Sequence, residues 1–133
     1  MFIMAINDIV DCAVHALALL FADDIKMAMT VSSIDDTRCL QSDINNVLQW
    51  SERNKLPFNL VKCEVITVKR CNQFYNATYM MGSHTVERKE EVRDLGITVD
   101  LRFTFGAHID RSRTKARQMM GYIKSIIKRT IRH

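Results

Sequence analysis

The chain has few of the residues that break regular structure or cross-link small domains. Its 133 residues include one proline, four glycines and four cysteines. So few breakers indicate that most of the chain forms helices or strands. The cysteines form no Cys-x-x-Cys pair, which excludes the common zinc and dithiol motifs and indicates a reducing compartment.

Long apolar runs are also missing. The stretch "AVHALALLFA" is interrupted by His15 and is too short to span a bilayer. No basic segment precedes it, as one would in a secretory signal. We therefore expect a cytoplasmic or nuclear chain without a membrane partner. Apolar residues make up 47% and charged residues 26%, which is ordinary for a globular domain.

Acidic residues are nearly absent from the last quarter of the chain. Residues 101–133 contain nine Lys and Arg against one Asp, whereas residues 1–100 contain ten bases against fourteen acids. Basic clustering of this kind is typical of a surface that binds a polyanion such as nucleic acid. A solvated helix face is the alternative.

Local patterns predict a hairpin followed by a helix in the first half. Two short apolar runs, 16–21 and 25–31, flank Asp23 and Asp24, which predicts a tight hairpin with both aspartates near its tip. Ser33 then offers an N-cap for a helix over about 35–54. Its apolar stripe comprises Leu40, Ile44, Val47, Leu48 and Ser51, and Trp50 is expected in the core.

The middle of the chain reads as strands. "LVKCEVITVKR" is rich in β-branched residues and predicts a central strand. "FYNATYMM", the turn "GSH" and "TVER" predict a second hairpin. "DLGITVD" predicts a further short strand, with Gly96 at a bulge or a close backbone approach.

The last element is predicted to be a basic amphipathic helix, or a pair of helices, over about 107–130. The pairs Met80–Met81 and Met119–Met120 are expected to fill gaps in the core. The expected class is therefore α+β, with an antiparallel sheet and packed helix followed by a basic helical segment.

Three interpretations compete for the adjacent acids Asp23 and Asp24. In the first interpretation they are polar residues that a turn simply tolerates. The second, the acidic pocket of a receiver domain, needs alternating β and α units and a later strand ending in Asp, and it fails because "VITVKR" ends in cations. The third is part of a metal site for phosphoryl transfer, in which a cation relieves the repulsion between the carboxylates. The first and third remain open on these residues.

The order of motifs resembles a known family. "FADD" between two apolar runs resembles the catalytic box of reverse transcriptases from non-LTR retrotransposons of the LINE and jockey type. The segment "MFIMAINDIVDCAVHA" resembles the lead-in to that box, and "LQSDINNVLQWSERNKLPFNLVKCEVITV" is similar to the helix and Lys-Cys signature that follow it. Next, "MMGSHTVERKEEVRDLGITVD" resembles the family's later hairpin and its Leu-Gly element. Finally, "LRFTFGAHIDRSRTKARQMMGYIKSI" resembles the start of the thumb.

The resemblance implies a partial polymerase palm over 1–100 and a thumb-like segment over 101–133. The implied activity is RNA-directed DNA synthesis, with Mg²⁺ (or Mn²⁺) as cofactor and an RNA template, a DNA primer and dNTPs as partners. Asp23 and Asp24 match the catalytic, metal-binding aspartates, and Phe21 and Ala22 match neighbouring nucleotide-proximal positions. Lys62 matches a lysine that assists the departure of pyrophosphate.

The resemblance also implies contacts with nucleic acid. Leu95 and Gly96 match the turn that grips the primer. The thumb-like helix would follow phosphates without reading sequence. Its candidate contacts are Arg111, Arg113, Lys115, Arg117, Lys124, Lys128 and Arg129.

The family's other metal-binding aspartate and its fingers have no counterpart in the 133 residues. Two-metal chemistry depends on positioning and charge neutralisation, so we expect the isolated chain to be inactive. We also expect an uncovered sheet edge and an uncovered apolar side of the FADD hairpin. A non-catalytic, nucleic-acid-binding remnant that uses the basic C-terminal helix is the alternative.

Overall fold

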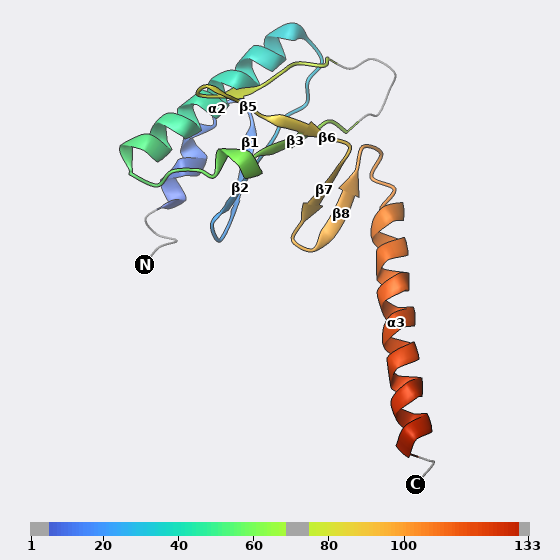
Figure 1. Ribbon diagram of the computed structural model, residues 1–133. Helices are drawn as coiled ribbons and strands as arrows, with labels where there is room; N and C mark the ends of the chain where they lie inside the picture. The colour runs from blue at the N-terminus through green and yellow to red at the C-terminus, as the bar shows by residue number, and fades with distance from the viewer. Residues whose placement is uncertain (1–5, 69–74, 131–133) are drawn as a thin grey trace. The chain divides into compact units, whose positions relative to one another are not determined.

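The computed structural model describes residues 6–68 and 75–130. The chain divides into two compact units, one comprising residues 1–65 and 71–87 and the other residues 66–70 and 88–133. Small antiparallel sheets alternate with helices in the described residues (Figure 1), which confirms the predicted α+β class.

The first hairpin of unit one is formed as predicted. Strands β1 (Leu17–Phe21) and β2 (Asp24–Ala28) pair antiparallel, with Phe21 opposite Asp24. Ala22 and Asp23 therefore make a two-residue turn. Successive side chains of a strand point to opposite faces, so one face of the hairpin packs on the core and the other faces outward.

The helix α2 (Ile34–Arg53) begins where the sequence predicts. The Ser33 hydroxyl accepts a hydrogen bond from the Asp36 N–H at 3.1 Å, and the Asp36 carboxylate accepts one from the Ser33 N–H at 2.8 Å. This capping box satisfies N–H groups that have no partner within the helix.

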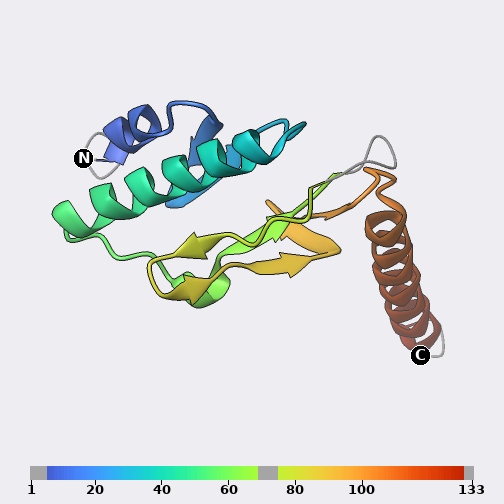
Figure 2. The same cartoon turned by 90° about the horizontal axis from the view of Figure 1, so that it is seen from above.

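Two apolar clusters form on α2. One joins Val47 and Trp50 to η1 (Asn7–Cys12) and to the inner face of the first hairpin. The other holds Tyr79, Met81 and Val86. Figure 2 shows η1 on one side of the helix and strands β4 (Met80–Met81) and β5 (His84–Thr85) on the other. Trp50 is 5% exposed, which confirms its predicted core position.

The second predicted hairpin is confirmed but is short. Strands β4 (Met80–Met81) and β5 (His84–Thr85) pair around a two-residue turn. Gln41 on α2 donates a hydrogen bond to the Met80 carbonyl and accepts one from the Met80 N–H, both at 2.8 Å. The helix thus satisfies backbone groups that β4 would otherwise leave unpaired. Met81 is buried as predicted, whereas Met80 is exposed.

The prediction of a strand over "LVKCEVITVKR" is confirmed for three residues only, and the predicted central position is wrong. The stretch begins with a 3₁₀ turn, η2 (Leu60–Lys62), and continues as a three-residue strand, β3 (Glu64–Ile66). The Cys63 N–H donates to the Leu60 carbonyl at 3.2 Å, which turns the chain before it extends. In the described residues β3 pairs only with β6 (Glu87–Lys89). The end of the stretch, residues 69–70, lies outside the described part.

The prediction of a single strand over "DLGITVD" is also wrong. Strands β7 (Glu91–Asp94) and β8 (Ile97–Asp100) form a hairpin in unit two, with Leu95 and Gly96 as its turn. Gly96 has φ of +87°, and a Cβ placed on it would meet no atom within 4 Å. The positive φ therefore favours glycine at this position. The predicted bulge and the predicted close backbone approach are both absent here among the described residues.

The last element is one helix, α3 (Gly106–Thr130), as predicted. In unit two its first turns meet β8, where the Thr98 N–H donates to Nδ1 of His108 at 3.4 Å. Every residue from 109 to 130 is exposed. The prediction that Met119 and Met120 fill the core is therefore wrong. None of the described helices combines the length and apolarity needed to cross a membrane.

Candidate active site on the first hairpin

The tip of the first hairpin brings together four of the predicted site residues. Phe21 and Asp24 close the strands, and Ala22 and Asp23 form the turn between them. Ala22 has φ of +55°. A positive φ at the first turn residue alone is the pattern of a type II′ turn, where glycine is usual. An alanine there costs about 1 kcal/mol, so the acidic pair sits on a strained turn.

Both carboxylates of the turn are available to a ligand. Asp23 and Asp24 are exposed, and neither carboxylate has a hydrogen-bond or ion-pair partner in the described residues. Mg²⁺ takes about six oxygen ligands and usually keeps several waters, so one or two carboxylates contribute part of a site. In the part of the chain that the structure describes, no three His, Cys, Asp or Glu side chains converge into a metal-binding group. The turn therefore offers two carboxylates without a third side-chain ligand of these types.

The β1 part of the hairpin's outward face is apolar up to the acidic turn, whereas β2 places Lys26 on that face opposite Leu19. Leu17, Leu19 and Phe21 alternate along β1 and are 61%, 53% and 60% exposed. Monomeric soluble proteins seldom leave such a contiguous set in water. Their exposure confirms the expectation that this side of the hairpin lacks a cover in the described residues.

The entrance to β1 is held by Asp43, which the sequence reasoning missed. Its fully buried carboxylate accepts backbone N–H groups from Val14 at 3.0 Å, His15 at 2.8 Å and Ala16 at 2.7 Å. Nδ1 of His15 lies 3.2 Å from Oδ1 of the same carboxylate. Asp43 lies within the helical stripe defined by Leu40 and Val47, and an acid inside an apolar stripe is the signal that could have identified it.

The hydrogen bonds at Asp43 outweigh the effect of its burial. Removal from water raises the pKa of this carboxyl, but the N–H groups of Ala16, His15 and Val14 and the His15 ring bond to the charged form. The net result is a lowered pKa, so Asp43 is an anion at neutral pH. A buried anion thus fixes the chain five residues before the FADD box begins.

The remaining predicted site residues lie on other elements. Lys62 is exposed and ends η2 in unit one. Leu95 and Gly96 form the β7–β8 turn in unit two. Leu95 is a non-glycine residue at φ of +46° and is 56% exposed. Within unit one, no hydrogen bond or ion pair of the described residues joins Lys62 to the acidic turn.

The predicted nucleic-acid-binding bases of α3 fall into two groups. Nη1 of Arg111 donates to the Thr98 hydroxyl at 2.7 Å, and Nη2 contacts Glu91 at 3.0 Å, so this guanidinium joins the helix to its own hairpin. Arg113 lies 3.8 Å from Asp110. The other bases have no ion-pair partner in the described residues: Lys115, Arg117, Lys124, Lys128 and Arg129.

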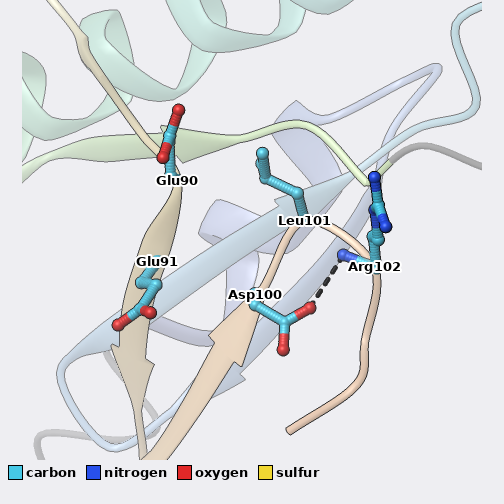
Figure 3. A pocket seen from close by; sticks show the side chains of 5 residues that line it. All are labelled: Glu90, Glu91, Asp100, Leu101 and Arg102. Atoms are coloured by element: carbon cyan, nitrogen blue, oxygen red, sulfur yellow. Dashed lines mark hydrogen bonds between the residues drawn. The ribbon is translucent and has the colours of Figure 1, made fainter. Parts of the chain in front are cut away.

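A shallow hollow in unit two is lined by three acids (Figure 3), and the carboxylates of two of them, Asp100 and Glu91, are engaged by other groups. Hydrogen bonds from the Thr104 hydroxyl and N–H and from the Arg102 N–H lower the pKa of Asp100 to about 2. Glu91 pairs with Arg111. The hollow, whose other lining residues are Glu90 and Leu101, is therefore part of the turn that leads into α3.

Comparison with known proteins assigns no family. No protein-family model matches the chain, and no curated protein or solved structure matches it. The chemistry of the acidic turn thus rests on its residues and on the order of the surrounding motifs.

Proposed function

We propose that the chain is part of an RNA-directed DNA polymerase of the non-LTR retrotransposon type. The observation that carries this proposal is the pair of unpartnered carboxylates, Asp23 and Asp24, on the strained tip of a hairpin. The motif order, from the FADD hairpin through the capped helix α2 to the basic helix α3, supports it. The reaction would be attack of a primer 3′-hydroxyl on the α-phosphate of a dNTP.

The two aspartates fit one part of such a site. Bound Mg²⁺ (or Mn²⁺) neutralises the charge that develops on the transferred phosphate. Asp23 and Asp24 would hold the cation at the exposed turn, while Phe21 and Ala22 would border the nucleotide. Two carboxylates alone leave most of the coordination to water, so we expect the isolated chain to bind the cation weakly and to catalyse no synthesis.

Cation binding is the direct test of the turn. Paramagnetic Mn²⁺ should broaden the backbone amide signals of residues 21–25 in an NMR titration, and Asp23→Asn with Asp24→Asn should remove the effect. Asp35→Asn, on an exposed acid of α2, is the matched control and should change nothing. Broadening that survives the double substitution would show that Asp23 and Asp24 are only polar turn residues.

Primer extension tests the expected inactivity. We expect no product from an RNA template, an annealed DNA primer and four dNTPs with either Mg²⁺ or Mn²⁺. Template-directed extension that Asp23→Ala abolishes would contradict the inactivity of the isolated chain and would strengthen the polymerase proposal.

A second candidate, non-catalytic binding of nucleic acid through α3, is favoured by a separate observation. The five bases without ion-pair partners are all exposed, and no acid follows Asp110 in the helix. This function needs neither aspartate of the first hairpin. It predicts salt-sensitive binding that Asp23→Ala leaves unchanged.

A further inference from the structure

The helix α3 leaves an apolar stripe uncovered. A helix turns about 100° per residue, and on this basis the stripe occupies an arc about 120° wide, in which His108, Ser112 and Thr130 are the polar members. Its large side chains are between 43% and 61% exposed. The apolar residues of the arc are Ile109, Ala116, Met119, Met120, Ile123, Ile126 and Ile127.

The bases of α3 border this stripe on both sides. With the same rotation per residue, one border carries Arg113, Arg117, Lys124 and Lys128, and the other carries Lys115 and Arg129. The middle of the face opposite the stripe, an arc about 60° wide, is uncharged and consists of Ala107, Thr114, Gln118, Gly121 and Ser125. A helix whose charges served only to face water would have them on that opposite face.

The possible partners of α3 differ in whether they match its apolar stripe, its bases or both. A nucleic-acid duplex would pair with the bases but would leave the apolar stripe in water. A second α3 would cover the stripe but would bring two strongly basic helices together. An anionic bilayer accepts both, because the stripe enters the acyl boundary while the Lys and Arg stems extend along it to the lipid phosphates.

We propose that α3 binds the surface of an anionic lipid bilayer, lying in its plane. Each Lys or Arg near such a surface strengthens binding in a salt-dependent way, and the apolar stripe adds a salt-independent share. Tyr122 lies between Lys115 and Arg129 on the border, where an aromatic ring with a polar end is well placed. The helix lies on the membrane without crossing it, in accord with its many charged residues.

Flotation with vesicles tests the proposal on the whole chain. The probes are vesicles of phosphatidylcholine alone and of phosphatidylcholine with phosphatidylserine. We expect binding only to the second kind, with an affinity that falls as salt rises. Ile123→Asp, at the centre of the stripe, should weaken binding at least about tenfold, because a carboxylate replaces an apolar side chain that the bilayer would bury.

Ser125→Asp is the matched control, since it adds the same charge on the opposite face of the same helix. We expect it to weaken binding less than about threefold, through the charge alone. Equal losses for the two variants would overturn the proposal, because the stripe would then play no part. Equal binding to neutral vesicles would also overturn it.

Two further outcomes would show that α3 binds a different partner. If light scattering shows an oligomer that Ile123→Asp converts to a monomer and neither vesicle binds, a second copy covers the stripe and the proposal is wrong. If a duplex binds, Ile123→Asp and Ser125→Asp should weaken that binding equally. Duplex binding without vesicle binding would assign the bases to nucleic acid alone.

Discussion

Asp43 holds the entrance to β1 with a carboxylate that accepts three backbone N–H groups and lies against His15. We expect Asp43→Ala to lower the free energy of unfolding by about 3 kcal/mol, because it leaves buried N–H groups without acceptors. Asp43→Asn should cost about 2 kcal/mol, since its NH₂ group faces donors. Denaturant unfolding followed by circular dichroism measures both.

Asp35→Asn is the control for this substitution. Its carboxylate is exposed and pairs with Arg38 at 2.9 Å, so we expect a loss of about 0.5 kcal/mol or less. A loss from Asp43→Asn as small as this would show that the entrance to β1 does not depend on the buried anion.

The lowered pKa of Asp43 also sets the sign of a pH dependence. A carboxyl with a lower pKa in the folded state stabilises the fold above its unfolded pKa, near 4, and this stabilisation is lost as pH falls through the folded pKa. The stability difference between wild type and Asp43→Asn should therefore be largest at neutral pH and shrink below about pH 4. A difference that stays constant down to pH 2 would contradict the assigned cause.

Asp43 shows which part of the site a local sequence pattern cannot predict, namely contacts between residues far apart in the chain. The sequence predicts the acidic turn because Asp23 and Asp24 interrupt two apolar runs within a few residues. Asp43 contacts partners 27 to 29 residues away, and helical periodicity does not show which backbone groups will meet it. Its position inside the stripe of α2 indicates burial, but its partners depend on how the chain folds back.

At the scale of elements, the β7–β8 hairpin has an unfavourable turn residue. Leu95 and Gly96 both have positive φ, the pattern of a type I′ turn, in which Asn-Gly is preferred. We expect Leu95→Asn to stabilise the hairpin by about 1 kcal/mol, because asparagine tolerates this conformation and the lost leucine is mostly exposed. Hydrogen exchange of the amides of residues 91–100 measures the change.

Leu95→Ala is the matched control for that change. It removes the same side chain but gains none of the tolerance for positive φ, so exchange should remain as in wild type. If Leu95→Asn also leaves exchange unchanged, strain at this residue does not limit the hairpin.

Element prediction succeeds where the signal is local and repeated. The helix α2 has its capping box and apolar stripe in one continuous segment, and α3 has a long helical pattern in which Gly121 is the one internal breaker. Prediction fails in "LVKCEVITVKR", where β-branched residues favour a strand but the backbone turns at Leu60 before three residues extend. It also fails at Gly96, because a glycine inside an apolar run signals a bulge and a two-residue turn equally well.

At the scale of the whole molecule, charge is concentrated in one helix. Residues 101–133 carry nine Lys and Arg against one Asp, while the rest of the chain is net acidic. The sequence predicts this basic helix and its candidate contacts, but Arg111 is engaged by Glu91 and Thr98 in unit two. Composition alone cannot show that Arg111 is engaged, because its ion-pair partner Glu91 lies 20 positions away and is brought close only by the β7–β8 hairpin.

Duplex binding separates the two roles of α3. If the bases contact phosphates, the logarithm of the binding constant should fall linearly with the logarithm of salt concentration. Replacing Arg117, Lys124 and Lys128 by glutamine should reduce that slope by up to about 3, because each base that contacts a phosphate contributes about one unit. Asp23→Ala, which removes no base, should leave both the affinity and the slope unchanged.

A competition experiment with duplex and vesicles tests whether both partners bind the same bases of α3. The bases that would face lipid phosphates are the same ones that would face nucleic acid, so one α3 cannot hold both at full affinity. Adding a duplex to vesicle-bound protein should therefore release it from the membrane. Triple substitution of Arg117, Lys124 and Lys128 should weaken both kinds of binding, whereas Ile123→Asp should selectively weaken vesicle binding. Simultaneous binding of duplex and vesicle without loss of affinity would show that the two partners use different parts of the chain.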